Sequence, residues 1–165
     1  MGSITESNLQ EISNNIENMI SNLQKSRSNY QKQQTSLYWS SVKMLYCIQC
    51  WEKEKESIEN LKELVSDMIK DTESILELAV NLRNDIKKIL DNRTADSERQ
   101  ADQINIINEN INELALLCKE YEEKQKTYGQ KVIAVKNMMQ NRNTERNTVW
   151  KKIKHVFWRD SIWND

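Results

Sequence analysis

Residues 58–89 read IENLKELVSDMIKDTESILELAVNLRNDIKKI, and their apolar side chains recur at alternating spacings of three and four residues. These spacings place the apolar residues on one face of an α-helix and are typical of a coiled-coil seam. The same seven-residue ladder extends back to Leu9, and 19 of the 24 positions that it defines up to Ile89 are apolar. The stretch therefore predicts one long amphipathic helix over residues 3–90.

A second ladder of the same kind occupies the C-terminal part of the chain. It runs from Ile104 to Trp163, and 14 of its 18 positions are apolar. Between the two ladders, residues 91–97 are polar and poor at extending a helix, and Ser97–Gln100 (SERQ) is typical of a capping box that opens a new helix. We predict a turn at 91–97 and a second long helix at 98–163.

The composition excludes most other folds. The chain has 165 residues, no proline and only two glycines, Gly2 and Gly129. Sheets and loop-rich domains need Gly or Pro at their turns, whereas long helices need neither. With 30% charged and 38% hydrophobic residues, the sequence suits narrow apolar seams. We predict a single all-α domain over residues 1–165, folded as a long antiparallel helical hairpin or coiled coil.

A short turn between two long helices makes them antiparallel neighbours, so that facing residues should have numbers adding up to about 189 or 190. Both ladders obey this rule, as in Ile75 with Leu114. The second helix would end opposite residue 25. This leaves one apolar stripe at the N-terminus without a partner within the chain; it consists of Leu9, Ile12, Ile16, Met19 and Leu23.

Two alternatives remain open for this stripe. Because the ladder continues without interruption, we favour pairing with another chain, which would make the stripe an oligomerisation surface. Alternatively, the chain breaks at 26–36 and folds back as a third helix. Dimerisation of a hairpin would give a four-helix bundle. Polar residues at ladder positions, among them Glu54 and Gln125, cost stability but specify register and oligomeric state. Around Arg142 and Arg146 they also suggest a kink at 141–148.

Charge is segregated along the chain, although the formal net charge is only −1. Residues 52–123 carry 19 acidic and 10 basic side chains, whereas residues 25–51 and 124–160 together carry 14 basic and two acidic ones. The hairpin would bring the two basic segments together, with Trp39 facing Trp150. We therefore predict a basic, Trp-rich end that presents itself to a partner. Its candidate anion- and partner-binding residues are Lys25, Arg27, Lys32, Lys43, Arg142, Arg146, Lys151, Lys152, Lys154 and Arg159. Its aromatic cluster consists of Trp39, Trp51, Trp150, Phe157, Trp158 and Trp163.

Several uses of such an end remain open. The Trp residues could simply pack the end of the bundle while the Lys residues face water. Amphipathic aromatics beside basic residues also suit an acidic groove on another helical protein or an anionic membrane surface. A nucleic-acid backbone is the less favoured partner. We expect a non-enzymatic structural or adaptor protein that self-associates, and the alternative is a membrane-active bundle docking through its C-terminal segment.

The sequence offers little chemistry for catalysis. Cys47 and Cys50 form a CxxC pair inside the ladder, with only Cys118 and His155 as further soft ligands, and a structural zinc site usually takes four. We therefore expect the cysteines to pack as small apolar residues, and we expect no cofactor, no metal, no catalytic set and no small-molecule substrate. No stretch has the roughly 18 to 20 apolar residues of a membrane span, and the sparse cysteines favour a reducing compartment. We expect an intracellular, soluble protein in the cytoplasm, with peripheral membrane contact as the alternative.

Overall fold

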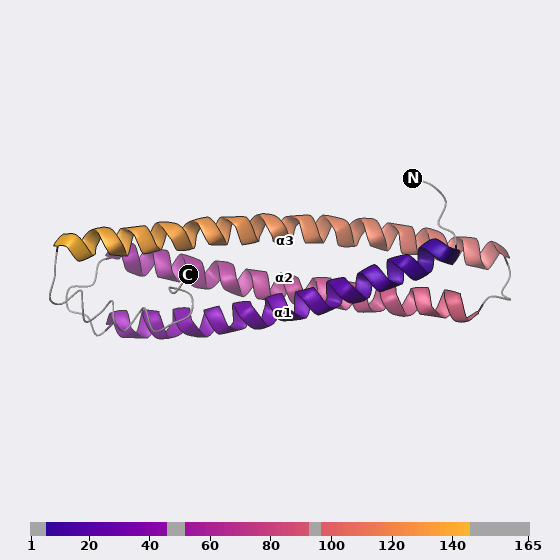
Figure 1. Ribbon diagram of the computed structural model, residues 1–165, viewed down its shortest axis with the longest axis horizontal. Coiled ribbons are helices and arrows are strands. Elements are labelled where there is room, and N and C mark those ends of the chain that lie inside the picture. Colours follow the sequence, from indigo (N-terminus) through magenta and orange to yellow (C-terminus); the bar gives the residue numbers. More distant parts are fainter. Residues whose placement is uncertain (1–5, 46–51, 93–96, 146–165) are drawn as a thin grey trace. The chain divides into compact units, whose positions relative to one another are not determined.

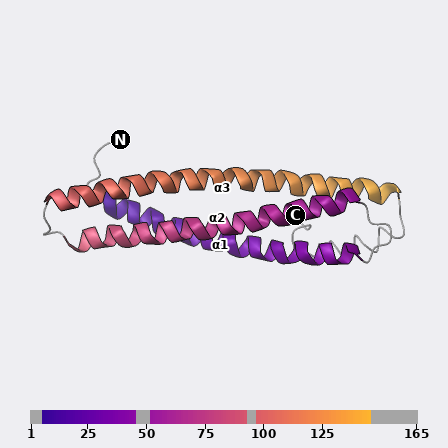
Figure 2. The same cartoon turned by 180° about the vertical axis from the view of Figure 1, so that it is seen from behind.

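Three α-helices make up the described part of the chain. The computed structural model describes residues 6–45, 52–92 and 97–145. In them, α1 spans Glu6–Leu45, α2 spans Glu52–Asp91 and α3 spans Ser97–Glu145. Figures 1 and 2 show these helices from opposite sides. Since the described ranges contain helices and no strand, the predicted all-α class is confirmed.

The chain divides into two compact units, and every helix contributes a segment to each of them. Unit 1 combines Met1–Arg27 with Lys70–Tyr121, and unit 2 combines Ser28–Ile69 with Glu122–Asp165. In both units, contacts between helices bury the apolar faces that the ladders predicted. Each unit is therefore a small helical bundle.

The helix α2 supplies most of the deeply buried side chains of both units. Its core residues lie at ladder positions and are no more than 1% exposed. In unit 1 they are Thr72, Ile75, Ala79, Leu82 and Ile86. In unit 2 they are Glu54, Ile58, Leu61, Val65 and Met68. Burial of one Leu or Ile side chain stabilises a fold by roughly 1.5 to 3 kcal/mol, so this face of α2 is the main apolar surface around which the other two helices pack.

Contacts in unit 2 give the directions of its helices. The Ser41 hydroxyl donates to a Glu59 carboxylate oxygen at 2.8 Å, and the Lys62 ammonium lies 5.9 Å from the centre of the Tyr38 ring. As the α1 residue number falls, the α2 number rises, so α1 and α2 are antiparallel. The α1 and α3 partners instead differ by a constant 95 in sequence, as in Tyr30 with Gln125. These two helices run in the same direction.

One long helix over residues 3–90 was therefore the wrong expectation. α1 ends at Leu45 and α2 begins at Glu52, and in one continuous helix the 18 residues between Ser41 and Glu59 would span about 27 Å. The ladder could not reveal this, because a heptad pattern records which side of a helix is buried and not whether the helix continues. Both halves keep the same face towards the core after the chain has turned back.

The alternative break at 26–36 also lies in the wrong place, since α1 continues from Glu6 to Leu45. Within that stretch, inward-facing polar side chains form hydrogen bonds with α3, such as Ser26 with Tyr121 and Tyr30 with Gln125. Folding back after Leu45 was not among the alternatives that we considered. The kink expected at 141–148 lies partly beyond the described residues, and α3 is helical as far as Glu145.

The N-terminal stripe finds its partners within unit 1. Leu9, Ile16 and Leu23 are buried, and Ile12 and Met19 are half-buried. The Cys118 thiol of α3 lies 4.0 Å from the Met19 sulfur. The premise that this stripe lacks a partner within the chain was therefore wrong. Once the chain turns after Leu45, α1 lies along α2 and α3 and no longer extends past the end of the second helix.

The end of α2 and the start of α3 lie on either side of the turn predicted at 91–97, and the predicted end of the second helix at residue 163 lies outside the described residues. α2 ends at Asp91, within one residue of the expected position, and α3 begins at Ser97, where the SERQ capping box starts. The buried Glu54 also lies in the first turn of α2. A carboxylate is favoured there because the unsatisfied amides at a helix N-terminus carry partial positive charge.

Replacement of a core residue of α2 should be far more damaging than replacement of an exposed residue of α3 in the same unit. Leu82 is fully buried, whereas Leu116 is 58% exposed. We predict that Leu82→Ala lowers the free energy of unfolding by about 2 to 5 kcal/mol, and that Leu116→Ala changes it by no more than about 0.5 kcal/mol. Urea unfolding followed by circular dichroism measures both. Equal losses would contradict the assignment of α2 as the core helix.

Candidate functional site

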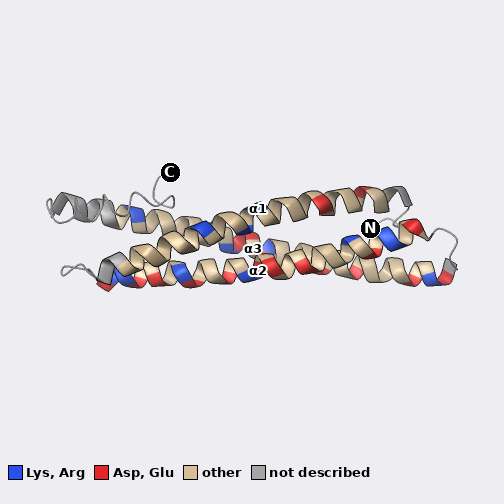
Figure 3. Cartoon of the chain, turned by 90° about the horizontal axis from the view of Figure 1, so that it is seen from below, with Lys and Arg blue, Asp and Glu red and all other residues tan. Residues whose placement is uncertain are grey.

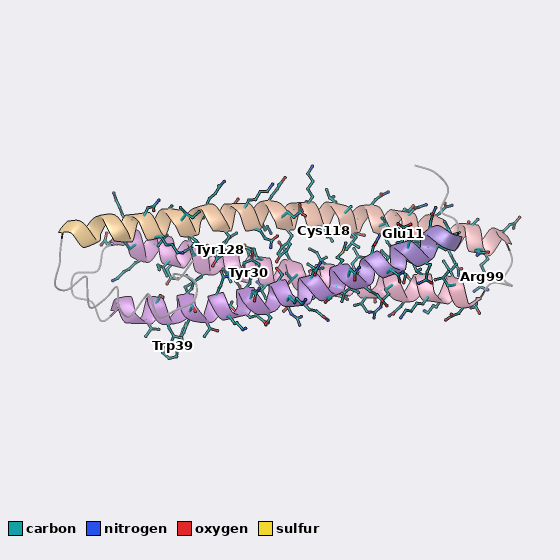
Figure 4. All side chains as sticks on the ribbon, viewed as in Figure 1. Glu11, Tyr30, Trp39, Arg99, Cys118 and Tyr128 are labelled. Atoms are coloured by element: carbon teal, nitrogen blue, oxygen red, sulfur yellow. The ribbon has the colours of Figure 1, made fainter. Side chains whose placement is uncertain are left out.

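Two neighbouring aromatic side chains project from α1 in unit 2. Tyr38 and Trp39 are 52% and 51% exposed, and their rings meet edge to face with centroids 5.5 Å apart. In Figure 4 the Trp39 side chain points away from the helix into solvent. Leu37 occupies the buried ladder position, so the next two residues along the helix must face outward. We call Tyr38, Trp39 and Lys62 the aromatic patch.

The aromatic patch borders a groove between α1 and α2 of unit 2. The volume of the groove is about 510 Å³. Its lining residues come from both helices and are Gln34, Thr35, Tyr38, Glu59, Lys62, Glu63 and Ser66. A cation near an aromatic ring is attracted by the ring electrons, and Lys62 takes this place beside Tyr38 while its ammonium also lies 3.2 Å from Glu59.

Charge differs between the two walls of this groove. Residues 28–45 of α1 contain two Lys residues and no Asp or Glu, whereas residues 52–69 of α2 contain six acidic and three basic residues; Figure 3 shows the charged residues by colour. The Ser41 hydroxyl lowers the pKa of Glu59, burial opposes this effect, and Lys62 reinforces it. Glu59 therefore stays ionised at neutral pH, and the groove has an acidic wall with Glu59 and Glu63 opposite a wall that carries Tyr38.

Polar side chains connect α1 to α3 inside each unit. In unit 1, the Ser26 and Tyr121 hydroxyls are 2.6 Å apart. In unit 2, the Gln125 amide donates to the Tyr30 hydroxyl at 3.1 Å, and the Tyr128 hydroxyl donates to Gln33. The members of each pair are 95 residues apart in sequence. We call these three contacts the polar pairs.

The polar pairs are partly shielded from water. Tyr128 is 5% exposed, and its ring meets that of Tyr30 edge to face at 5.7 Å between centroids. Both side chains are labelled in Figure 4. Burial, followed by the neighbouring Tyr30 hydroxyl, raises the pKa of Tyr128 above its ordinary value. The neutral phenol is thus the form that the folded protein holds. Hydrogen bonds of this kind form in only one register of α1 relative to α3, so they stabilise that register over others.

Only part of the predicted basic, Trp-rich end lies in the described residues. Lys25 of unit 1 is exposed and Arg27 is half-buried, while Lys32 and Trp39 of unit 2 are exposed. Lys43 and Arg142 lie in helices, but their side chains are outside the described part. The other predicted members lie beyond the described residues, and their gathering stays a prediction: Trp51, Arg146, Trp150, Lys151, Lys152, Lys154, Phe157, Trp158, Arg159 and Trp163.

Sequence reasoning missed the groove and the role of Tyr38. A signal was present, because two consecutive aromatics cannot both face the core of a two-ladder helix, but the interpretation considered Trp39 only as part of a cluster with Trp150. Glu59 and Lys62 were missed because α2 was not expected to fold back onto α1. Of the cysteines, Cys118 is half-buried against Met19, while Cys47 and Cys50 lie outside the described residues. No described helix is long and apolar enough to cross a lipid bilayer.

No protein-family model, no curated protein and no solved structure matches this chain. The site must therefore be interpreted from its own geometry.

The polar pairs predict a pH dependence of stability at high pH. The unfolded Tyr128 ionises near its ordinary pKa of about 10, whereas the folded one keeps its proton to higher pH, so the unfolded state binds fewer protons there and the free energy of unfolding falls as the pH rises. Between about pH 9 and about pH 11.5, we expect Tyr128 to lower the free energy of unfolding by about 2 kcal/mol.

Urea unfolding of the wild type and of Tyr128→Phe at both pH values tests this expectation. The variant should be about 1 kcal/mol less stable at neutral pH because it lacks the hydrogen bond to Gln33, and it should lose less stability than the wild type at high pH. Tyr38→Phe, at a half-exposed position, is the matched control. An unchanged slope in Tyr128→Phe would show that this hydroxyl is not buried.

Proposed function

We propose that this chain is a non-enzymatic helical-bundle protein that acts as an adaptor and binds another protein through the aromatic patch of unit 2. The observation that carries the proposal is the half-exposed, edge-to-face pair of Tyr38 and Trp39 beside a groove with an acidic wall. Isolated exposed apolar residues are ordinary on protein surfaces, but Trp and Tyr side by side are the residue types that most often dominate binding energy at interfaces.

The chemistry of the groove indicates the kind of partner. Trp39 and Tyr38 offer an apolar contact, and Glu59 and Glu63 on the facing wall favour a positively charged side chain. A partner helix could place an apolar residue against Tyr38 and Trp39 and a neighbouring Lys or Arg beside Glu59 and Glu63. Lys62 already makes this pair of contacts within the chain, to the Tyr38 ring and to Glu59, so an incoming cation would take over an arrangement that the groove accommodates.

The finer details of the fold belong to this proposal as well. We infer that α2 and α3 pair as an antiparallel coiled coil, with facing residues close to the register that the two ladders predict. Buried ladder positions on both helices support this pairing, such as Ile75 with Leu114 in unit 1. A second groove in unit 1 also supports it, because its lining comes from the last turns of α2 and the first turns of α3: Asp85, Lys88, Ile89, Gln103, Ile106 and Ile107.

Site-specific photo-crosslinking in the cells that produce the protein tests the adaptor function. The photoreactive residue p-benzoylphenylalanine replaces Trp39 in one variant and Ile133, an exposed residue of α3 in the same unit, in the control. We expect a discrete adduct with another protein from position 39 and none from position 133. The adduct should weaken when Glu59→Lys and Glu63→Lys reverse the charge of the acidic wall. Equal labelling from both positions, or none from either, would contradict the proposal.

A second candidate function is docking on an anionic membrane surface, the role expected of the basic, Trp-rich segment. The exposure of Trp39 and Lys32 on α1 of unit 2 favours it, because Trp sits at the headgroup level and Lys is attracted by acidic lipids. Co-sedimentation with vesicles of phosphatidylcholine, with and without phosphatidylserine, distinguishes this function. Binding that needs phosphatidylserine and is lost in Trp39→Ala with Lys32→Glu supports docking, and no binding at low salt rejects it.

A further inference from the structure

The connection between α1 and α2 has an unusual sequence for a turn. α1 ends at Leu45 and α2 begins at Glu52, and the residues between them read YCIQCW. This segment contains no Gly, Pro, Asn, Asp or Ser, the residues that tight turns normally use. It also keeps the apolar ladder in frame, since Met44, Cys47 and Trp51 are ladder positions between Leu37 and Ile58. The sequence of residues 46–51 thus favours a continuous helix, although α1 and α2 pack antiparallel in unit 2.

The attachment of α1 has a second distinctive property. Between Leu23 and Leu37 the helix contains no aliphatic side chain, and its contacts with α3 over this stretch include the polar pairs and the edge-to-face rings of Tyr30 and Tyr128. Aliphatic burial is concentrated towards the N-terminal part of α1 in unit 1, at Leu9, Ile16, Ile20 and Leu23, and at Leu37 in unit 2. The six residues 46–51 connect α1 to α2.

We propose that this chain exchanges α1 with a second copy of itself. In the exchanged dimer, α1 and α2 of one chain join end to end, and each α1 packs on α2 and α3 of the other chain. Every contact of α1 is then made again between chains, so that only the connection differs between the two states. Such an exchange is closed and two-fold symmetric, and it is a low-cost route to a dimer.

The surface that receives α1 is selective for this occupant. It presents the apolar face of α2 together with Tyr121, Gln125 and Tyr128 of α3, whose polar groups lose their partners when α1 leaves. A buried polar group without a partner is costly, so the incoming helix must place hydrogen-bonding groups at the matching positions. α1 of a second copy does so with Ser26, Tyr30 and Gln33. A generic aliphatic helix would leave the tyrosine hydroxyls unsatisfied.

The exchange does not rest on the adaptor function, because it uses the inner face of α1 and not the aromatic patch. It would give each dimer two aromatic patches, and a partner with two binding sites would then be held more tightly than by one patch alone.

A crosslink between α1 and α2 distinguishes exchange from other modes of association. Ser41→Cys and Glu59→Cys are introduced into the full chain, with Cys47→Ser, Cys50→Ser and Cys118→Ala to remove the native thiols. The side chains of Ser41 and Glu59 touch in the folded protein, so a short bis-maleimide should join the two new cysteines. In the monomer the crosslink forms within one chain. In an exchanged dimer it joins two chains and doubles the 19.6 kDa mass on a denaturing gel.

We expect crosslinked double-mass species after refolding at high protein concentration, and single-mass species after refolding at high dilution. Substitutions in the connection should shift this balance. Ile48→Gly with Gln49→Asn favours a turn and should weaken dimerisation by about tenfold or more, whereas Ile48→Ala with Gln49→Ala favours a helix and should strengthen it by a similar factor.

Two results would overturn the exchange. One is a protein that stays monomeric by light scattering at every concentration, with both pairs of connection variants. The other is a dimer by light scattering in which the bis-maleimide joins cysteines only within single chains, since this would mean association through another surface. Circular dichroism of each variant separates a failure to fold from a failure to exchange.

Discussion

The arrangement of this protein depends on one constraint, namely that the middle of α1 has no aliphatic side chain to bury. Between Leu23 and Leu37 its inner face contacts α3 through hydrogen bonds to Tyr121, Gln125 and Tyr128 and through the ring of Tyr30, which meets that of Tyr128. All three polar pairs join residues 95 apart. An apolar interface tolerates sliding by one heptad because any aliphatic side chain can replace another. A hydrogen-bonded one does not, since a shift by seven residues would leave buried hydroxyls without partners.

Within each unit, the apolar face of α2 and the hydrogen-bonded contact between α1 and α3 contribute differently to the fold. The inner face of α2 is almost entirely apolar and fully buried, so it provides the bulk of the stabilisation. The contact between α1 and α3 adds less free energy but selects the register. The inner faces of the helices provide both the stabilisation and the register. Tyr38 and Trp39 lie on the outer face of α1, where neither contribution depends on them. The antiparallel neighbour α2 places Glu59 and Lys62 beside them, which gives the patch its mixed aromatic and charged character.

The sequence predicted the helices far better than it predicted the path of the chain. The ladder positions of α2 are buried, and the SERQ motif marks the start of α3, because burial periodicity and capping are local properties. The turn after Leu45 was missed because YCIQCW lacks every usual turn residue and stays in the ladder. Polar residues at 26–36 suggested a break, although three of them, Ser26, Tyr30 and Gln33, are the α1 half of the polar pairs. The aromatic patch was missed in part for the same reason, since Lys62 and Glu59 meet Tyr38 and Ser41 only when α2 folds back.

The distance between spin labels at Lys32→Cys and Thr127→Cys in the monomeric protein, in a background without the native cysteines, tests the arrangement most directly. Both residues are exposed in unit 2, and they are separated by the same 95 positions as the polar pairs. Helices in contact lie about 8 to 10 Å apart, so the labels on their outer faces should be about 20 Å apart. In a single hairpin of two long helices, residue 32 would instead face residue 157 or 158. Position 127 would then lie about 45 Å away along the helix. The shorter distance supports parallel packing of α1 and α3, and the longer one would contradict it.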